Sequence, residues 1–461
     1  MFKRLFNWSP KNFPIYYGWL IIVFGIVGVL MSVPGQTIGI SVFTDYLMKS
    51  LNLSRVYLAL AYLIGTAGSS FILTYAGKLY DRHGARNTAA IAGLGLGLVL
   101  IYMTKIDGLG FMMEPHLAGK ISFEVLMFIL VIIGFFGIRF FGQGVLTMVS
   151  RNMIMKWFNR KRGLASAILG IFLTFGFSYA PRLFDDLIKI YGWRGAWFMI
   201  ALVIGLGFVL FALVFFKDNP QKFGLEPDGE TFGKKEENTG KKGTRLKNIL
   251  FFKLKKLPVY KPKMDYTLKD AKKTYSFWIF SLSLAMFTLF ITALTFNVVS
   301  IFKNASLTRE VALDIFLPSA LVAVFFNVLF GWLSDFIKLK YLLFVELTGL
   351  ALASIGLMFL NSGFPVWLII VGNGMAQGSF SVLSSVTWPR FYGINHLGAI
   401  SGYAMSFMVA GSAVGPLLFS LSLKYSDGYY LAGLGSLIIT IILLILSFKA
   451  ENVNEVKVME K

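Results

Sequence analysis

The sequence predicts an all-α membrane protein whose twelve transmembrane helices form two pseudo-symmetric six-helix bundles. Apolar residues occupy 56% of the 461 positions and the mean hydropathy is +0.70, whereas a soluble chain is nearer half apolar and about a quarter charged. The apolar residues are gathered into blocks of roughly 20 residues or more, the length that a helix needs to cross a hydrocarbon core. Short motifs also recur in the same order in both halves of the chain. Together these observations indicate two related bundles of spanning helices.

The N-terminal half supplies the first six spans. The first span follows the basic segment 1–16 and continues without a small-residue cleavage site, so we expect an uncleaved helix and not a signal peptide. Short basic loops follow the second and fourth apolar blocks. The expected spans are residues 17–46, 56–77, 88–104, 123–150, 163–184 and 193–216.

A long polar interruption separates these spans from six more apolar blocks. The expected spans of the second half are residues 276–302, 311–334, 341–360, 365–390, 397–423 and 429–449. The chain should therefore divide into an N-terminal bundle (1–216), a basic cytoplasmic linker (217–275) and a C-terminal bundle with a short cytoplasmic tail (276–461).

The distribution of positive charge predicts the orientation. The net charge is +21, and with both termini in the cytoplasm 33 of the 44 basic residues lie inside, 10 lie outside and one, Arg139, lies within a span. This bias agrees with the positive-inside rule, and we expect an integral protein of the cell's inner (plasma) membrane. Topology thus explains the charge, and because no stacking aromatic residues share a soluble basic face, we expect no nucleic-acid partner.

The second half of the linker reads TRLKNILFFKLKKLPVYKPK at positions 244–263. This basic, partly amphipathic stretch either lies on an anionic leaflet of the bilayer or is a solvated tether between the two bundles. The sequence leaves both interpretations open.

Several kinds of chemistry are missing from the sequence. The chain has no cysteine, which excludes disulfides, thiolate nucleophiles and cysteine-based zinc sites. We find no glycine-rich phosphate loop after a strand, no cluster of metal-ligating residues and no nucleophile beside a base. We therefore expect no enzymatic activity, no cofactor and no bound metal.

Three pairs of motifs relate the two halves. They are GKLYDRHGAR (77–86) with GWLSDFIKLK (331–340), GQG (142–144) with AQG (376–378), and GFSYAPRLF (176–184) with GSAVGPLLF (411–419). Halves related by an axis along the membrane normal place a substrate path between them, near the midplane.

The first of these motifs resembles the signature of the major facilitator superfamily between its second and third helices, and RFFGQG resembles its arginine-containing motif in the fourth helix. The matching positions are Gly77, Leu79, Asp81, Arg82, Gly84 and Arg86 in the first motif and Arg139, Gln143 and Gly144 in the second, whereas Asn87 departs from the final basic residue of the signature. The resemblance implies secondary transport, with Asp81, Arg82, Arg86, Gly77 and Gly84 forming a cytoplasmic latch against a helix N-terminus.

Four further segments are similar to the bacterial branch of oxalate/formate antiporters and monocarboxylate porters. They are WFNRKRGLASAILG (157–170), NPQKFGLEPDG (219–229), YTLKDAKKTYSFW (266–278) and NHLGAISGYAMSF (395–407). Relatives that carry carboxylates commonly place a basic residue in the eighth or eleventh helix. Here the span 311–334 has none, and the eleventh has none before Lys424.

Arg139 is the strongest candidate for a functional residue. An arginine at the centre of a spanning helix costs about 2.5 to 3.5 kcal/mol on insertion, so its charge must face protein or water. It either binds an anion or gates proton movement, or it bonds backbone carbonyls at a helix break.

Other polar residues are candidates for the walls of the path. Gln36 follows Pro34 and Gly35 at a predicted helix break, and Asn373 and Gln377 belong to a polar stripe with Ser381 and Ser384. The full set of expected substrate-binding residues is Arg139, Gln36, Gln143, Asn373, Gln377, Asn297 and Arg182. For Asn297 helix packing is the competing role, and for Arg182 it is an ion pair with Asp185 or Asp186.

These features lead to the expectation of a monomeric secondary transporter that moves a small organic anion across the lipid bilayer by alternating access. The coupling ion, a proton or a counter-anion, is left open, because no carboxylate is clearly central in a span. Two alternatives stay open as well. They are transport of a neutral or amphiphilic solute, including drug-type efflux, and a non-transporting nutrient sensor that signals through the linker.

Overall fold

The computed structural model describes residues 10–117, 122–229, 259–262, 264–361, 363–451 and 455–458. Nearly all of this part of the chain is helical. The short strands β1 (Val259–Pro262) and β2 (Glu455–Val458) form an antiparallel ribbon that joins the linker to the C-terminal tail. Most of the amphipathic stretch at 244–263, and with it the question of a membrane-lying or signalling linker, lies outside the described residues.

The N-terminal half consists of helices that cover residues 10–229. They are η1 (Pro10–Asn12), α2 (Gly18–Leu30), η2 (Val33–Gly35), α3 (Thr37–Ser41), α4 (Thr44–Leu51), α5 (Arg55–Thr104), α6 (Ile106–Leu117), α7 (Phe123–Ile138), the π-helical η3 (Arg139–Leu146), α8 (Thr147–Trp157), α9 (Arg162–Leu202), the π-helical η4 (Val203–Phe208), α10 (Val209–Phe215), η5 (Pro220–Phe223) and η6 (Pro227–Gly229).

The short helix α12 (Leu268–Ala271) ends the linker and leads into the C-terminal half. The helices of that half are α13 (Tyr275–Asn304), α14 (Arg309–Asp314), α15 (Phe316–Ser334), α16 (Leu339–Met358), α17 (Phe364–Tyr392), α18 (Leu397–Ser426) and α19 (Tyr430–Ser447).

Two long helices reach across two predicted spans: α5 contains both of its spans, and α9 contains the span 163–184 and the start of 193–216, which continues through η4 and α10. The backbone turns within α5 at Gly84 (φ 77°) and within α9 at Gly192 (φ 69°), in a region that glycine adopts without a Cβ penalty. Gly65 and Met103, on the two arms of α5, both lie against the segment 132–136 of α7. The arms of α5 therefore run in opposite directions past the same part of α7.

The number of spans agrees with the sequence. Within the described residues, nine helices are long and apolar enough to cross a membrane. The structure accounts for all twelve spans, because α5 and the continuous stretch from α9 to α10 hold two predicted spans each, and the first span is divided among α2, α3 and α4. The predicted all-α, twelve-helix fold is confirmed.

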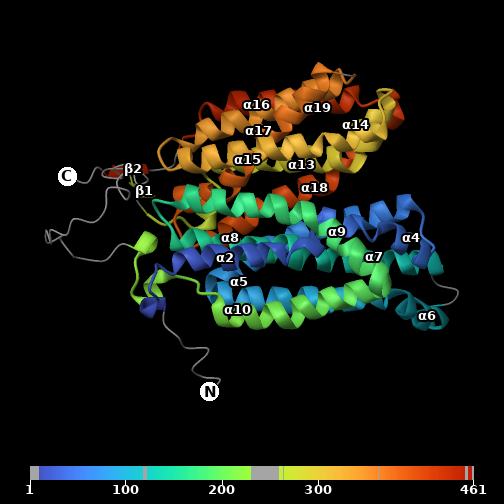
Figure 1. Cartoon of the computed structure of the whole chain (residues 1–461), viewed down its shortest axis with the longest axis horizontal. Coiled ribbons are helices and arrows are strands. Elements are labelled where there is room, and N and C mark those ends of the chain that lie inside the picture. The colour runs from blue at the N-terminus through green and yellow to red at the C-terminus, as the bar shows by residue number, and fades with distance from the viewer. Residues whose placement is uncertain are drawn as a thin grey trace.

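The two halves meet at crossings of small residues. Figure 1 shows α13 to α19 grouped together beside the group from α2 to α10. Across the boundary α18 packs against α5, and α15 packs against α9. A Cβ at Gly77 would lie 2.0 Å from the carbonyl oxygen of Gly398, and one at Gly163 would lie 1.9 Å from that of Gly331. Glycine at these positions lets the helix backbones touch.

Candidate functional site

Arg139 lies at the junction of α7 and η3 and is fully buried. Its Nη1 donates to the carbonyl oxygen of Gly35 at 3.0 Å and to the hydroxyl of Thr37 at 3.4 Å, and its Nη2 donates to the hydroxyl of Ser412 at 2.9 Å. The guanidinium carbon also lies 5.2 Å from the centre of the Tyr62 ring. The side chain therefore joins the first helix of the N-terminal half to α18 of the C-terminal half.

The local sequence explains why a carbonyl is available to Arg139. Pro34 cannot donate a backbone hydrogen bond, and the backbone at Gln36 is extended (φ −87°, ψ 155°), so the helix is interrupted between α2 and α3. Gly35 and Gly142 pack so closely that a Cβ on either would lie within 2.8 Å of the other. The first span and the fourth span thus touch at these two glycines. The guanidinium of Arg139 donates a hydrogen bond to the Gly35 carbonyl that the helix break leaves free.

The positive charge of Arg139 has only neutral partners among the described residues. A carbonyl, two hydroxyls and an aromatic ring surround it, and no ion pair of this part of the chain includes it. Its buried Nε has no hydrogen-bond partner there. A buried cation held by neutral dipoles keeps much of its capacity to attract an anion.

Two of the other predicted residues lie near this arginine. Gln36 donates to Ser32 at 3.1 Å and to Thr147 at 3.3 Å, beside the break that Arg139 caps. Gln143 lies in η3, one helical turn after Arg139, and its buried Oε1 has no partner among the described residues.

The C-terminal candidates are divided in their placement. In α17, Asn373 is buried with its Oδ1 unpartnered within the described residues, and Gln377 is half-buried one turn further on. In contrast, Asn297 donates to the carbonyl of Ala293 in its own helix and to that of Pro416, and it accepts from Ser420. The contacts with Pro416 and Ser420 join α13 to α18.

Arg182 lies apart from the buried arginine. Its side chain is exposed on α9. The ion pair expected with a neighbouring aspartate is replaced by a different one, because Asp185 and Asp186 both pair with Lys189. Arg182 and Lys189 both lie three and four residues from the aspartates, but only Lys189 follows them, and a base C-terminal to the acid is the more favourable order on a helix.

A second arginine of the fourth span was missed by the sequence analysis. Arg151 of α8 donates through Nη1 to Ser384 at 2.6 Å and to Ser385 at 3.3 Å, across the boundary between the halves. Its neighbour Asn152 donates to Ser401 of α18 at 2.7 Å. The predicted span ended at residue 150, which placed Arg151 in a loop. The polar stripe that contains Ser381 and Ser384 could have indicated this arginine, because buried hydroxyl groups need hydrogen-bond partners on a facing helix.

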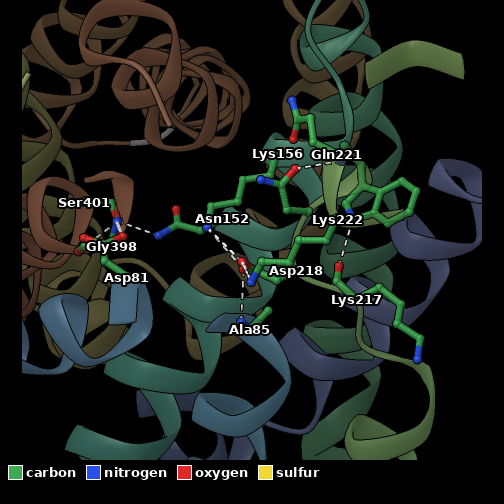
Figure 2. A network of polar contacts seen from close by, with 12 residues as sticks. Asp81, Ala85, Asn152, Lys156, Lys217, Asp218, Gln221, Lys222, Gly398 and Ser401 are labelled. Carbon is green, nitrogen blue, oxygen red and sulfur yellow. Dashed lines mark hydrogen bonds and ion pairs between the residues drawn. The ribbon is translucent and has the colours of Figure 1, made fainter. Parts of the chain in front are cut away.

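Asp81 holds the start of α18, as the latch hypothesis expects (Figure 2). Its two carboxylate oxygens accept the backbone N–H groups of Gly398 and Ala399 at 2.7 and 2.8 Å. These N–H groups have no intrahelical acceptors, and the positive end of the helix dipole favours the carboxylate. Of the other predicted latch residues, Arg82 is exposed and Arg86 is half-buried. Gly77 lies where α5 crosses α18, and Gly84 is the turn of α5.

Asp335 repeats this arrangement in the other half. It occupies the position of Asp81 in the second copy of the motif, and its Oδ1 accepts the N–H of Gly163 at the start of α9 at 2.9 Å. Burial raises the pKa of Asp335 from 3.8 to about 7, although the N–H of Gly163 and the charge of Arg390 lower it. Each half thus places one aspartate on a helix N-terminus of the other half.

The hydrogen bonds that join the halves fall between Arg139 and the two aspartates. We call the end of the bundle that carries Asp81 and Asp335 the latch end. Besides the bonds above, Arg162 of α9 donates to the carbonyl of Pro389, and Ser166 donates to that of Ser381. The two halves are therefore in contact at the latch end in this structure.

A sequence model of the Major Facilitator Superfamily matches residues 20–416. The chain belongs to the major facilitator superfamily. A comparison with curated proteins finds no match. The arginine and the two aspartates described above are therefore parts of a major facilitator, whose members are transporters and not enzymes.

Solved structures share the fold of this major facilitator at low sequence identity. A bacterial homologue of the iron transporter ferroportin in an outward-facing state has a TM-score of 0.65 at 13% identity, with 93% of this chain and 99% of that chain covered. The E. coli fucose:proton symporter FucP has a TM-score of 0.57 at 16% identity, with 94% and 99% covered. The human organic anion transporter TETRAN has a TM-score of 0.58 at 13% identity, with 93% and 99% covered. At these identities the likeness concerns the fold, and the narrower resemblance to oxalate/formate antiporters stays a prediction.

Proposed function

We propose that this major facilitator is a secondary active transporter of a small organic anion of carboxylate type, working by alternating access across the cytoplasmic membrane. The observation that carries the proposal is Arg139, a fully buried guanidinium with only neutral partners among the described residues and a buried Nε without an acceptor there. The site residues, the orientation with both termini inside and the monomeric state remain parts of this proposal.

The geometry suggests how binding would be coupled to movement. Arg139 holds the C-terminal half through one hydrogen bond to a neutral acceptor, the hydroxyl of Ser412 at 2.9 Å. A carboxylate can accept two parallel N–H bonds from a guanidinium and carries the opposite charge, so it binds more strongly than a hydroxyl. An anion that reaches the guanidinium would therefore replace the Ser412 hydroxyl and break the contact between η3 and α18. Because the anion binds more tightly to the conformation without this contact, it would shift the equilibrium toward that conformation.

A counterflow assay tests this function. Proteoliposomes loaded with small carboxylates, with and without a pH gradient, should show saturable uptake that Arg139→Ala abolishes and Arg139→Lys strongly reduces, because lysine cannot reach Gly35 and Ser412 at once. Lys424→Ala, which removes an exposed cation at the far end of α18, should transport like the parent chain. Uptake that persists in folded Arg139→Ala would reject the anion role.

A neutral hydroxylated solute is the second candidate. Buried amide atoms of Gln143, Asn327 and Asn373 have no hydrogen-bond partner among the described residues, and such groups favour a ligand that supplies polar partners. Thermal stabilisation separates the two candidates, because a bound ligand raises the unfolding temperature. Stabilisation by carboxylates supports the anion, whereas stabilisation by uncharged polyols alone supports the neutral solute.

A further inference from the structure

The latch end also carries a cavity whose wall is rich in basic side chains. This cavity of about 640 Å³ opens beside Asp81, between the turn of α5, the short helix α12 and the start of α18. The cationic side chains on its wall are Lys78 and Arg82 from α5 and Lys269 and Lys272 from α12, and His396 adds an imidazole. The N-terminal bundle, the linker helix and the C-terminal bundle therefore all contribute to one basic cavity.

The positive charge of this cavity is poorly compensated. No ion pair among the described residues includes Lys78, Arg82, Lys269 or Lys272, and Lys272 lies 3.6 Å from the centre of the Tyr403 ring. The one carboxylate on the wall, Asp81, already accepts two backbone N–H groups. Four cations thus face one occupied acid.

Nearby acids are also engaged elsewhere. Asp270 of α12 accepts from Thr267 and pairs with Lys273 at 3.5 Å. Asp265 accepts from the backbone of Ile394 at 2.8 Å and from the side chain of Asn395. Neither carboxylate is therefore placed to neutralise the lysines of the cavity wall.

We propose that this cavity binds a phosphate-type anion, either a phospholipid head group or a free phosphate. Clustered ammonium and guanidinium groups provide the charge-assisted donors that phosphate oxygens accept, and the cavity volume accommodates such a group. A phosphate held by α5 and α12 together crosses the same boundary as Asp81, so it stabilises the closed arrangement of the latch end. The site is independent of the solute that the transporter carries.

The test measures stabilisation of the purified full-length protein by inorganic phosphate against chloride of equal ionic strength. The same protein is then compared in vesicles of phosphatidylcholine with and without phosphatidylglycerol. A rise in unfolding temperature with phosphate identifies a free anion as a ligand, and a rise with phosphatidylglycerol alone identifies the head group. Both results support the site. No rise in either arm overturns it.

Variants of α12 separate the site from general electrostatic attraction. The double substitution Lys269→Gln with Lys272→Gln should weaken the binding of inorganic phosphate or phosphatidylglycerol by about tenfold or more. The double substitution Lys269→Arg with Lys272→Arg should retain this binding. The matched control is Lys273→Gln, which removes the adjacent charge that is already paired with Asp270. Equal weakening by Lys273→Gln, or full binding by the double glutamine variant, would overturn the proposal.

Discussion

At the scale of single residues, this transporter depends on buried charges that are held by neutral groups. Arg139 donates to a carbonyl and hydroxyls, and Asp81 and Asp335 accept from backbone N–H groups. A pair of opposite buried charges would lock the two halves with several kcal/mol, whereas neutral partners hold each charge by about 1.5 to 3 kcal/mol per hydrogen bond. Such bonds can be exchanged during a transport cycle.

Removal of the Ser412 hydroxyl should destabilise the protein. Ser412→Ala leaves an N–H of Arg139 without its acceptor, and a buried unsatisfied donor costs about 1 to 3 kcal/mol. Thermal unfolding of the purified protein should show the loss, while Ser41→Ala, which removes an exposed hydroxyl bonded within its own helix, should leave the unfolding temperature unchanged. An unaltered Ser412→Ala protein would mean that the bond contributes nothing.

Asp335 should make the closure of the latch end depend on pH. Its pKa is about 7 when buried against Gly163, with Arg390 and Asp228 as charged neighbours, and 3.8 is the ordinary value expected when opening exposes it. The closed state therefore binds a proton more tightly, so its stabilisation by protonation is complete below about pH 4 and is lost as the pH rises through about 7.

Spin labels can follow this equilibrium because the chain has no cysteine. Labels on His83→Cys and Lys273→Cys, exposed positions on opposite halves, should come closer on average as the pH falls from about 8 to about 5. Asp335→Asn should remove most of this response. A response of the same size in Asp335→Asn would show that another group titrates.

At the scale of helices, glycine crossings control how closely the two halves approach. Gly77 touches the carbonyl of Gly398 where α5 crosses α18, and Gly163 touches that of Gly331 where α9 meets α15. The backbones cannot move aside without separating whole helices, because interiors are close-packed and deform little.

Gly77→Ala should open the latch end. The added methyl group would lie 2.0 Å from the carbonyl oxygen of Gly398, so α5 and α18 must move apart and the distance between the spin labels should increase. Gly435→Ala is the matched control, because a Cβ there meets nothing within 4 Å. Equal label distances in both variants would exclude a steric role for this crossing.

At the scale of the whole molecule, the two aspartates are related by the internal repeat and act on opposite halves. Asp81 reaches from the N-terminal half to α18, and Asp335 reaches from the C-terminal half to α9. Opening of the latch end has to break both contacts together with the bonds of Arg151 and Asn152.

The two latch contacts should contribute separately to closure. Asp81→Ala and Asp335→Ala each remove the acceptor of a backbone N–H group at a helix N-terminus, so each should shift the spin labels toward longer distances at about pH 8, and the double variant should shift them further. Asp186→Ala removes an exposed carboxylate on α9 far from the latch and serves as the control. Unchanged distances in the double variant would refute the latch.

The role of Asp81 as a latch residue came from the resemblance of its motif and stays a prediction. The sequence by itself determined the spans, the two related halves and the position of Arg139 within a span. It could do so because a bilayer imposes its constraint on each segment separately, through length and hydropathy. The proposed boundaries at 216 and 275 remain predictions of the same kind. Asp335 was also within reach, since it aligns with Asp81 in the repeated motif.

Only the tertiary structure decided which residues these groups meet. Arg139 and Ser412 are separated by 273 positions, Arg151 and Ser384 by 233, and Asp81 and Gly398 by 317. Hydropathy encodes how deep a residue lies but not which helix faces it, because that choice depends on the packing of small residues between helices. The partners of both arginines and the basic cavity beside Asp81 therefore emerge only when the two bundles are packed together.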